Sequence, residues 1–311
     1  MSKWRSVFLD AETLGLDSLD TRALKQLNLS LTCYQQTSEA NLLARIADAD
    51  IILVNKVQLE GASLCHAPHL KYIGVTATGT NNIDLEYCKK NGIRVQNVEG
   101  YGTDSVAQHT LMLLLNLATN FSQYQRDIKA GRWSKSPHFC LSQYDVMELA
   151  GKHAVIVGHG ELGKRVEGLF KALGMQVSIA ARPGNPNDTR PSLNTLLPKA
   201  DVVSLHCPLT RDTEKLINRD TLSLMKPTCF LINTARGGLI DEAALLQALK
   251  AQTIGGAALD VLTVEPPPEN HPLMQASLPN LLITPHNAWI ANASRQRLLN
   301  KVVEHLTAFI A

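Results

Sequence analysis

Three residues of complementary chemistry stand in the second half of the chain: Arg236, Glu265 and His286. Each follows a short apolar run that predicts a β-strand, so successive strands of one parallel sheet would carry them at the same edge. An arginine fork suits a carboxylate bidentately. A histidine can give and recover a proton near neutral pH, and a neighbouring carboxylate favours its protonated form. The set suits reduction of a 2-oxo acid, whose carbonyl oxygen must receive a proton.

Each of these side chains also has a plainer explanation. Arg236 could cap a helix or pair on the surface, Glu265 could be a loop carboxylate, and His286 could be a satisfied core histidine. Taken singly, these explanations are the commoner ones. Their joint occurrence at three strand ends, beside a glycine-rich turn, favours a functional site.

The glycine-rich turn consists of Gly158, His159, Gly160, Glu161, Leu162 and Gly163. It follows an apolar run at 154–157 and opens an amphipathic stretch at 166–173, which predicts strand, turn and helix. The three glycines would allow, in order, a tight turn, close approach of the backbone to a pyrophosphate, and close packing of helix on strand. The helix N-terminus would offer N–H groups to the phosphates. The turn therefore predicts a dinucleotide and hydride transfer; the alternative is a glycine turn without a ligand.

Short apolar runs that alternate with helical patterns must position these residues. We expect strands at 7–9, 29–32, 51–54, 72–75, 93–95, 154–157, 177–180, 202–205, 230–233, 257–259 and 281–284. Helices are expected at 39–47 and 84–90, and a last helix at 294–310 would pack back on the N-terminal unit. The alternation predicts an α/β fold with two doubly wound parallel sheets, the first domain being discontinuous.

Length, composition and charge limit the number of domains, the class of protein and the kinds of partner that we expect. The chain has 311 residues, 45% apolar and 19% charged, with a net charge of +2, which fits about two domains and argues against disorder or a nucleic-acid partner. The six cysteines are scattered, so we expect reduced thiols and no metal site. The apolar segment 110–118 is far shorter than the roughly 20 residues that span a bilayer. No apolar signal region accompanies Lys3 and Arg5, so we expect a cytoplasmic protein without a membrane partner.

The chain resembles the D-isomer-specific 2-hydroxyacid dehydrogenases, and within them the glycerate dehydrogenase/hydroxypyruvate reductase branch. The resemblance covers essentially the whole chain. Its motifs are TATGTNNID at 76–84, SVAQH at 105–109, VGHGELG at 157–163, INTARGGLID at 232–241, ALDV at 258–261, EP at 265–266 and TPHNAW at 284–289. Trp289, three residues after His286, and the segment 55–57 resemble the glycerate dehydrogenase branch.

The resemblance implies a fold and a set of roles. A Rossmann dinucleotide-binding domain at 101–287 would be inserted into a flavodoxin-like substrate domain formed by 1–100 and 288–311. His286 would be the acid in reduction and the base in oxidation, paired with Glu265, while Arg236 would bind the substrate carboxylate and carbonyl. Asp260 would orient the nicotinamide carboxamide. Further substrate contacts would come from Lys56, Ala77, Thr78 and Gly79, and further cofactor contacts from Thr103, His206, Pro208, Thr234 and Ala235; for His206 a structural role is the alternative.

One departure from the dinucleotide-binding pattern bears on the cofactor. The acidic residue that binds the adenosine ribose is expected at the end of the second strand, where this chain has Ala181 followed by Arg182. Loss of the carboxylate removes repulsion of a 2′-phosphate, and Arg182 could pair with one. We predict that NADPH is accepted, with a lean toward NADP(H) over NAD(H). The alternative is that Arg182 stacks on adenine and NADH works well.

Taken together, we expect an NAD(P)-dependent reductase of hydroxypyruvate or glyoxylate that yields D-glycerate or glycolate and also runs in reverse. The apolar helix at 106–118 resembles the family's dimer-interface helix, which implies a homodimer. One alternative is a dehydrogenase of another 2-hydroxy acid. The other is a dinucleotide-sensing interaction protein, because the family includes transcriptional corepressors that keep the arginine, glutamate and histidine.

Overall fold

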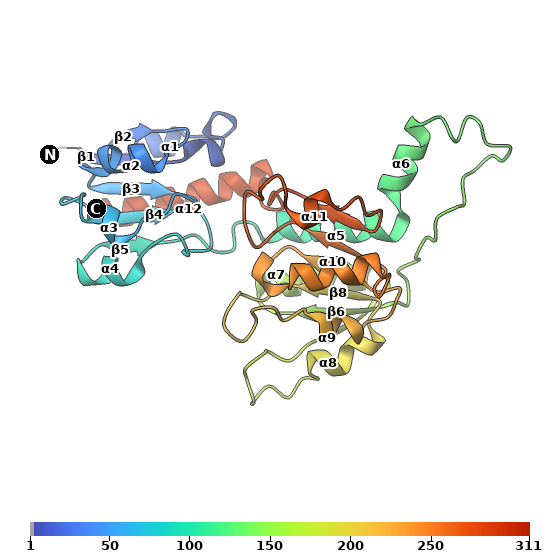
Figure 1. Cartoon of the computed structure of the whole chain (residues 1–311). Coiled ribbons are helices and arrows are strands. Elements are labelled where there is room, and N and C mark those ends of the chain that lie inside the picture. Colours follow the sequence, from blue (N-terminus) through green and yellow to red (C-terminus); the bar gives the residue numbers. More distant parts are fainter. Residues whose placement is uncertain (1–2) are drawn as a thin grey trace. The chain divides into compact units, whose positions relative to one another are not determined.

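The chain folds into two α/β units (Figure 1). The computed structural model describes residues 3–311. One unit holds the chain up to Gly102 together with Trp289–Ala311, and the other holds Thr103–Ala288. The first unit is therefore discontinuous, and the second is inserted into it.

The first unit is built on a five-stranded parallel sheet of order β2-β1-β3-β4-β5. This is the flavodoxin-like order 2-1-3-4-5. Apolar residues fill the central strands β3 and β4, as expected of a sheet covered on both faces. The strands are β1 (Trp4–Phe8), β2 (Leu29–Cys33), β3 (Ile51–Val54), β4 (Tyr72–Val75) and β5 (Arg94–Gln96).

Helices cover both faces of this first sheet. Ile52 and Ile73 pack toward α2 (Glu39–Ile46), α3 (Gly61–Leu64) and α4 (Leu85–Lys90). Their neighbours Leu53 and Tyr72 pack toward α1 (Arg22–Lys25) and the C-terminal helix α12 (Asn292–Ile310). The last helix thus joins the N-terminal unit, as the sequence predicts. Two short 3-10 turns, η1 (Ala11–Thr13) and η2 (Leu16–Ser18), follow β1.

The second unit is built on a six-stranded parallel sheet of order β11-β10-β9-β8-β6-β7. Its strands are β6 (His153–Val157), β7 (Gln176–Ile179), β8 (Val202–Leu205), β9 (Phe230–Asn233), β10 (Gly256–Leu259) and β11 (Leu281–Ile283). Every strand that the sequence predicts is present; some match the predicted range and the others have ends shifted by one residue or a few. The order reverses between β6 and β8, which is where ligands bind in such sheets.

The strand order differs in one respect from most dinucleotide-binding sheets. In those sheets a third strand lies outside the second, in the order 3-2-1-4-5-6. Here the chain leaves β7 and returns on the far side of β6, so β7 is the edge. Pro183, Pro186 and Pro191 occupy the connection, and proline cannot donate to a strand ladder. The connection instead contains only α8 (Leu193–Leu196) and η3 (Leu197–Lys199).

The alternating side chains of β6 show how the second sheet is covered. Ala154 and Ile156 pack toward α5 (Thr103–Thr119) and α7 (Glu161–Ala172). Val155 and Val157 point to the other face, which carries α8, α9 (Arg219–Ser223), α10 (Glu242–Lys250) and α11 (Pro272–Gln275). The short turn η4 (Gly237–Leu239) precedes α10. All six strands end at the edge where the predicted site residues follow.

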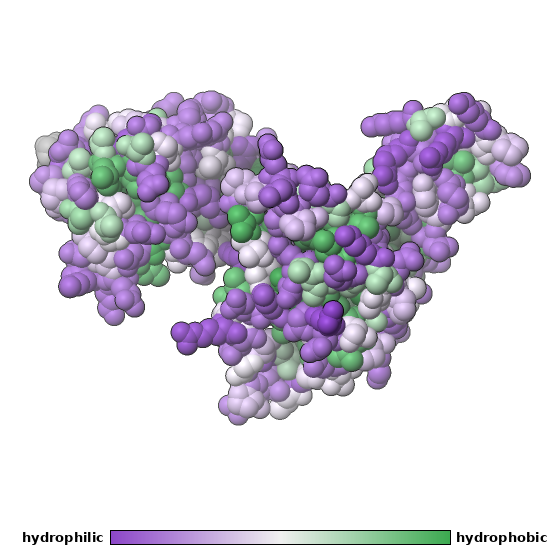
Figure 2. Space-filling model, in the orientation of Figure 1, coloured by the Kyte–Doolittle hydropathy of each residue, from purple (hydrophilic) through white to green (hydrophobic). Residues whose placement is uncertain are grey.

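A helix that the sequence did not predict, α6 (Phe121–Lys129), stands away from the sheet of the second unit together with the segment that follows it (Figure 1). Phe121, Ile128, Trp133, Phe139 and Val146 are exposed there. Green hydrophobic atoms are visible among the purple ones on this arm (Figure 2). We call residues 121–148 the arm.

The described residues, 3–311, carry neither a membrane-spanning helix nor a cluster of metal-ligating side chains. Within these residues no helix has both the length and the apolar character of a membrane span. Over the same range, no cluster of three or more histidine, cysteine or acidic side chains could hold a metal ion.

Candidate active site

The glycine-rich turn has the packing that a dinucleotide cradle requires. Gly158 has a φ of +95°, and a Cβ there would lie 2.5 Å from the peptide that joins His206 to Cys207. A Cβ on Gly163 would lie 2.1 Å from the carbonyl oxygen of Gly158. The position of a Cβ on Gly160, by contrast, meets nothing within 4 Å. Packing thus demands two of the glycines, and the third faces open space at the start of α7, where a pyrophosphate would fit.

The starts of two helices are joined beside this turn. Thr103 Oγ1, in the first turn of α5, donates to Glu161 Oε1 at 2.8 Å. Asp104 and Arg165 form a second link at 2.8 Å between Oδ1 and Nε. The cofactor residues predicted at Thr103 and Glu161 therefore lie together at the N-terminus of α7, followed by Leu162.

Glu265 and His286 form a close pair. Nδ1 of His286 lies 2.6 Å from Oε2 of Glu265, and the other oxygen, Oε1, accepts the N–H of Leu262 at 2.9 Å. The side chains are 29% and 32% exposed, so the pair is accessible from solvent. The carboxylate fixes the orientation of the imidazole by holding one of its two nitrogens.

Asp260 holds the backbone on which His286 is presented. Its side chain is almost completely buried, and its two oxygens accept the N–H groups of Asn287 and Ala288 at 3.0 Å each. The hydroxyl of Thr284 donates to it at 2.6 Å. His286 has a φ of +51°, a left-handed conformation that few non-glycine residues adopt. The Asp260 contacts stabilise this conformation, which is often found at functional sites.

Arg236 follows the neighbouring strand β9 in a turn that is held by side-chain hydrogen bonds. The buried side chain of Asn233 accepts the N–H of Ala235 at 3.0 Å and donates to the carbonyl of Arg236 at 2.9 Å. Nη1 of Arg236 donates to the carbonyl of Ala235 at 2.6 Å. The guanidinium forms no ion pair with a carboxylate in the described part of the chain. It is therefore available to an anionic substrate.

The side chain of the nearby Thr234 contacts the helix α5. Its side chain is buried, and its hydroxyl lies 3.0 Å from that of Thr110 on α5. Thr110 already donates to the carbonyl of Val106 at 2.9 Å, so Thr234 is the donor of the pair. A cofactor contact at Thr234 would thus come from its backbone.

The turn after β8 carries a neutral histidine. Nε2 of His206 lies 2.8 Å from the hydroxyl of Ser204, and burial lowers the pKa of His206 to about 3. Its Nδ1 has no hydrogen-bond partner within residues 3–311. Pro208 accepts the hydroxyl of Thr213 through its carbonyl at 2.7 Å, which shapes the same turn.

No acidic residue stands at the end of β7, where the chain has Ala181, but the carboxylate of Asp188 lies close to this position. Asp188 accepts the backbone N–H of Arg182 at 2.8 Å and pairs with the guanidinium of Arg190, which holds its pKa well below the usual range. The Arg182 side chain is exposed and forms no ion pair within residues 3–311. Of these two arginines, only Arg182 keeps an uncommitted guanidinium.

The predicted substrate residues of the first unit follow two adjacent strands. Lys56 comes after β3, and its backbone N–H donates to the buried Asp10 at 2.6 Å. Ala77, Thr78 and Gly79 come after β4. The Thr78 hydroxyl donates to the carbonyl of Val98 at 3.1 Å, which anchors this loop. The substrate contacts of these residues stay predictions.

Residues that sequence reasoning missed hold the loop of Glu265 in place. Glu242, at the start of α10, accepts the N–H of Thr263 at 2.7 Å, and its other oxygen lies 3.1 Å from Nε2 of His271. One carboxylate therefore ties both ends of the loop to α10. The acidic start of the helix was the only signal in the sequence, and it is equally typical of a simple helix N-terminus.

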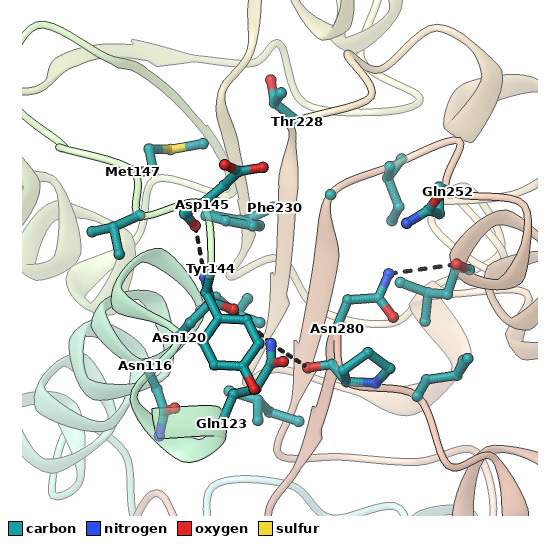
Figure 3. A pocket seen from close by; sticks show the side chains of 18 of the residues that line it. Asn116, Asn120, Gln123, Tyr144, Asp145, Met147, Thr228, Phe230, Gln252 and Asn280 are labelled. Atoms are coloured by element: carbon teal, nitrogen blue, oxygen red, sulfur yellow. Dashed lines mark hydrogen bonds between the residues drawn. The ribbon is translucent and has the colours of Figure 1, made fainter. Parts of the chain in front are cut away.

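A cavity of about 740 Å³ lies elsewhere in the second unit (Figure 3). Phe230 and Asn280 line it at the amino ends of β9 and β11, and Tyr144 and Asp145 of the arm line another side. The predicted site residues follow the carboxyl ends of the same strands. The cavity is therefore distinct from the candidate active site.

Comparison with known proteins gives consistent matches. Residues 111–288 match the NAD binding domain of the D-isomer specific 2-hydroxyacid dehydrogenases. The chain is 40% identical to a glycerate dehydrogenase of Methylorubrum extorquens, over 98% of this chain and 96% of the relative. It is 35% identical to a hydroxypyruvate reductase of Blautia hydrogenotrophica, over 98% and 96%. The structure of an NADPH-dependent glyoxylate/hydroxypyruvate reductase from Sinorhizobium meliloti, bound to NADP and malonate, is similar with a TM-score of 0.82, 27% identity and coverage of 100% and 94%.

Proposed function

The chain belongs to the family of D-isomer specific 2-hydroxyacid dehydrogenases, and from this premise we propose that it reduces hydroxypyruvate and glyoxylate to D-glycerate and glycolate, and catalyses the reverse reactions. The observation that carries the proposal is the 2.6 Å pair of Glu265 and His286. It stands beyond the carboxyl ends of β10 and β11, in the unit that holds the glycine-rich turn.

The residues of the second unit divide the work. A bound reduced nicotinamide dinucleotide supplies the hydride to the carbonyl carbon of the substrate. His286, as imidazolium, donates its proton to the carbonyl oxygen as negative charge develops there. Because Glu265 occupies Nδ1, we assign the proton transfer to Nε2. Glu265 stabilises the imidazolium before transfer and keeps the ring oriented.

Arg236 supplies the charge that selects a 2-oxo acid. A guanidinium offers two parallel N–H groups to a carboxylate, and the turn pinned by Asn233 keeps the arginine backbone rigid. The bond from Nη1 to the carbonyl of Ala235 would orient the guanidinium before the substrate arrives. A small substrate whose carboxylate is adjacent to the carbonyl suits this arrangement.

For the cofactor, we propose that both NADH and NADPH bind, with a lean toward NADPH. Two features support the lean. Ala181 stands where a ribose-binding carboxylate is usual, and the exposed Arg182 can reach outward because Asp188 is neutralised by Arg190.

For assembly, we propose a homodimer. The apolar side chains of Met112 and Leu115 on α5 are exposed, and so are those of Phe121 and Ile128 on the arm. Exposed apolar patches mark interaction sites. Sedimentation at micromolar concentration should show a dimer, and Met112→Glu with Leu115→Glu should shift it to monomer; a monomeric wild-type protein would contradict the proposal.

The test of the function is a panel of initial rates with hydroxypyruvate, glyoxylate and pyruvate, each with NADH and with NADPH. We expect fast turnover that is greatest with hydroxypyruvate. Greatest turnover with pyruvate would favour a dehydrogenase of another 2-hydroxy acid. Tight cofactor binding without turnover on any of the three would favour a sensing role.

A further inference from the structure

A histidine lies next to the site without a part in the chemistry described so far. His109 is in α5, and its side chain is 15% exposed. Its Nε2 lies 3.0 Å from the hydroxyl oxygen of Thr284 and 3.4 Å from Oδ1 of Asp260. Thr284 directly follows β11 on the way to His286, and Asp260 holds the backbone after His286.

The hydrogen bonds of this group have only one consistent direction. The Thr284 hydroxyl has a single proton, which it donates to Oδ1 of Asp260 at 2.6 Å. Its oxygen must therefore accept the proton of an N–H at Nε2 of His109. Burial lowers the pKa of His109 despite the nearby Asp260, so the ring is a neutral donor at pH 7. A chain of hydrogen bonds thus runs from His109 through Thr284 to Asp260.

The hydrogen-bond chain continues from Asp260 to the backbone next to His286. The Asp260 carboxylate accepts hydrogen bonds from the backbone N–H groups of Asn287 and Ala288, so its orientation determines where this backbone lies. His286 itself donates its N–H to the carbonyl of Asp260 at 2.8 Å. A carboxylate that can rotate would release two of these three contacts, and the left-handed φ of His286 would lose its support.

We propose that His109 is a positioning residue for the reaction: acting through the Thr284 hydroxyl, its imidazole N–H locks the Asp260 carboxylate in the orientation that holds the backbone of His286. The effect on rate rests on the proposed function. The effect on the backbone does not, because it depends only on contacts among four residues of one unit.

A purely structural role makes a different prediction. If His109 only fills space, then leucine should replace it better than glutamine does, and valine should replace Thr284 as effectively as serine does. If the hydrogen-bond chain matters, glutamine should be the better replacement for His109 and serine the better one for Thr284. Glutamine keeps a terminal N–H close to the place of Nε2, and serine keeps the hydroxyl.

The experiment therefore compares His109→Leu and His109→Gln with Thr284→Val and Thr284→Ser. We expect kcat for the best 2-oxo acid to fall about tenfold in the leucine and valine variants, because small misplacement of a catalytic group slows the chemical step. KM should change little, and the glutamine and serine variants should recover most of kcat. The double variant His109→Leu/Thr284→Val should lose no more than either single variant, because both break one chain.

A second readout needs no substrate or cofactor. Amide hydrogen exchange of Asn287 and Ala288 should be faster in His109→Leu by a clear factor, with exchange elsewhere in the sheet unchanged. The matched control is His153→Leu, because His153 Nε2 also contacts a hydroxyl, that of Ser178 at 2.8 Å, but at the other edge of the sheet. It should leave both kcat and these two amides unaltered.

The failures of the two proposals can be told apart. If the wild-type protein has no turnover, the proposed function fails while the exchange result still decides the positioning role. The positioning role is overturned if exchange at Asn287 and Ala288 is unchanged in His109→Leu, or if leucine supports kcat as well as glutamine does.

Discussion

Gly237 and Leu262 lie so close together that a Cβ on Gly237 would be 2.0 Å from the carbonyl carbon of Leu262. Gly237 directly follows Arg236, and Leu262 donates its N–H to Glu265 at 2.9 Å. The segments that carry the proposed substrate arginine and the proposed catalytic glutamate therefore pack backbone against backbone. Their spacing depends on the absence of one side chain.

Gly237→Ala should separate these two segments. The clash is with backbone atoms, so no side-chain rotation can relieve it, and we expect kcat/KM to fall about a hundredfold. Stability should fall by about 1–3 kcal/mol, as is usual for overpacking. Gly238→Ala is the control, because the three atoms nearest to its Cβ would all belong to the flexible side chain of Leu209. Steady-state kinetics that match wild type in Gly237→Ala would refute the spacing argument.

Arg236→Ala should impair use of the substrate far more than binding of the cofactor. Loss of a charged hydrogen-bond partner from a carboxylate should raise KM for glyoxylate by at least about tenfold, while the dissociation constant of the reduced cofactor stays near wild type. Arg236→Lys should recover only part of the loss, because an ammonium lacks the planar fork. Unchanged glyoxylate kinetics in Arg236→Ala would show that another group binds the carboxylate.

Arg182→Ala should weaken NADPH much more than NADH. An arginine that pairs with the 2′-phosphate contributes to one cofactor only, so the ratio of the two kcat/KM values should move toward NADH by about tenfold or more. Arg190→Ala tests the neighbouring guanidinium, which Asp188 holds. Equal loss with both cofactors in Arg182→Ala would instead indicate stacking on adenine.

His206 should make the protein less stable in mild acid. Burial lowers its folded-state pKa to about 3, from the ordinary histidine value of about 6.5. Between these values the unfolded chain binds a proton that the folded chain does not, so stability falls as the pH drops from about 6.5 toward 3. His206→Gln should flatten this part of the curve, measured by urea unfolding at several pH values. An unaltered slope would mean that His206 is not buried neutral.

Much of the fold could be predicted from the sequence because the strands are short buried apolar runs with clear breaks. The runs at 51–54, 72–75, 202–205 and 230–233 match the observed strands residue for residue. The arm was missed because α6 is short and polar on average, and the residue it buries is Asp127 rather than an apolar side chain. The place of β8 beside β6 depends on tertiary packing, which strand patterns do not encode.

The candidate site was predictable where residues follow strands directly. Strand ends placed Arg236, Glu265 and His286 at one edge, and the structure pairs the last two. The supporting residues were not predictable in the same way. His109 contacts Thr284 across 175 positions of sequence, and a single histidine in an apolar helix does not reveal its partner.

The central claim is that His286 transfers the proton, and His286→Ala tests it most directly. We would measure kcat/KM with the best 2-oxo acid beside the dissociation constant of the reduced cofactor and the melting temperature of the same preparation. The account predicts that turnover falls by about 10²–10⁴-fold, as for loss of a general acid, while cofactor affinity and melting temperature stay near wild type. Near-normal turnover in this variant would contradict the account and require another proton donor.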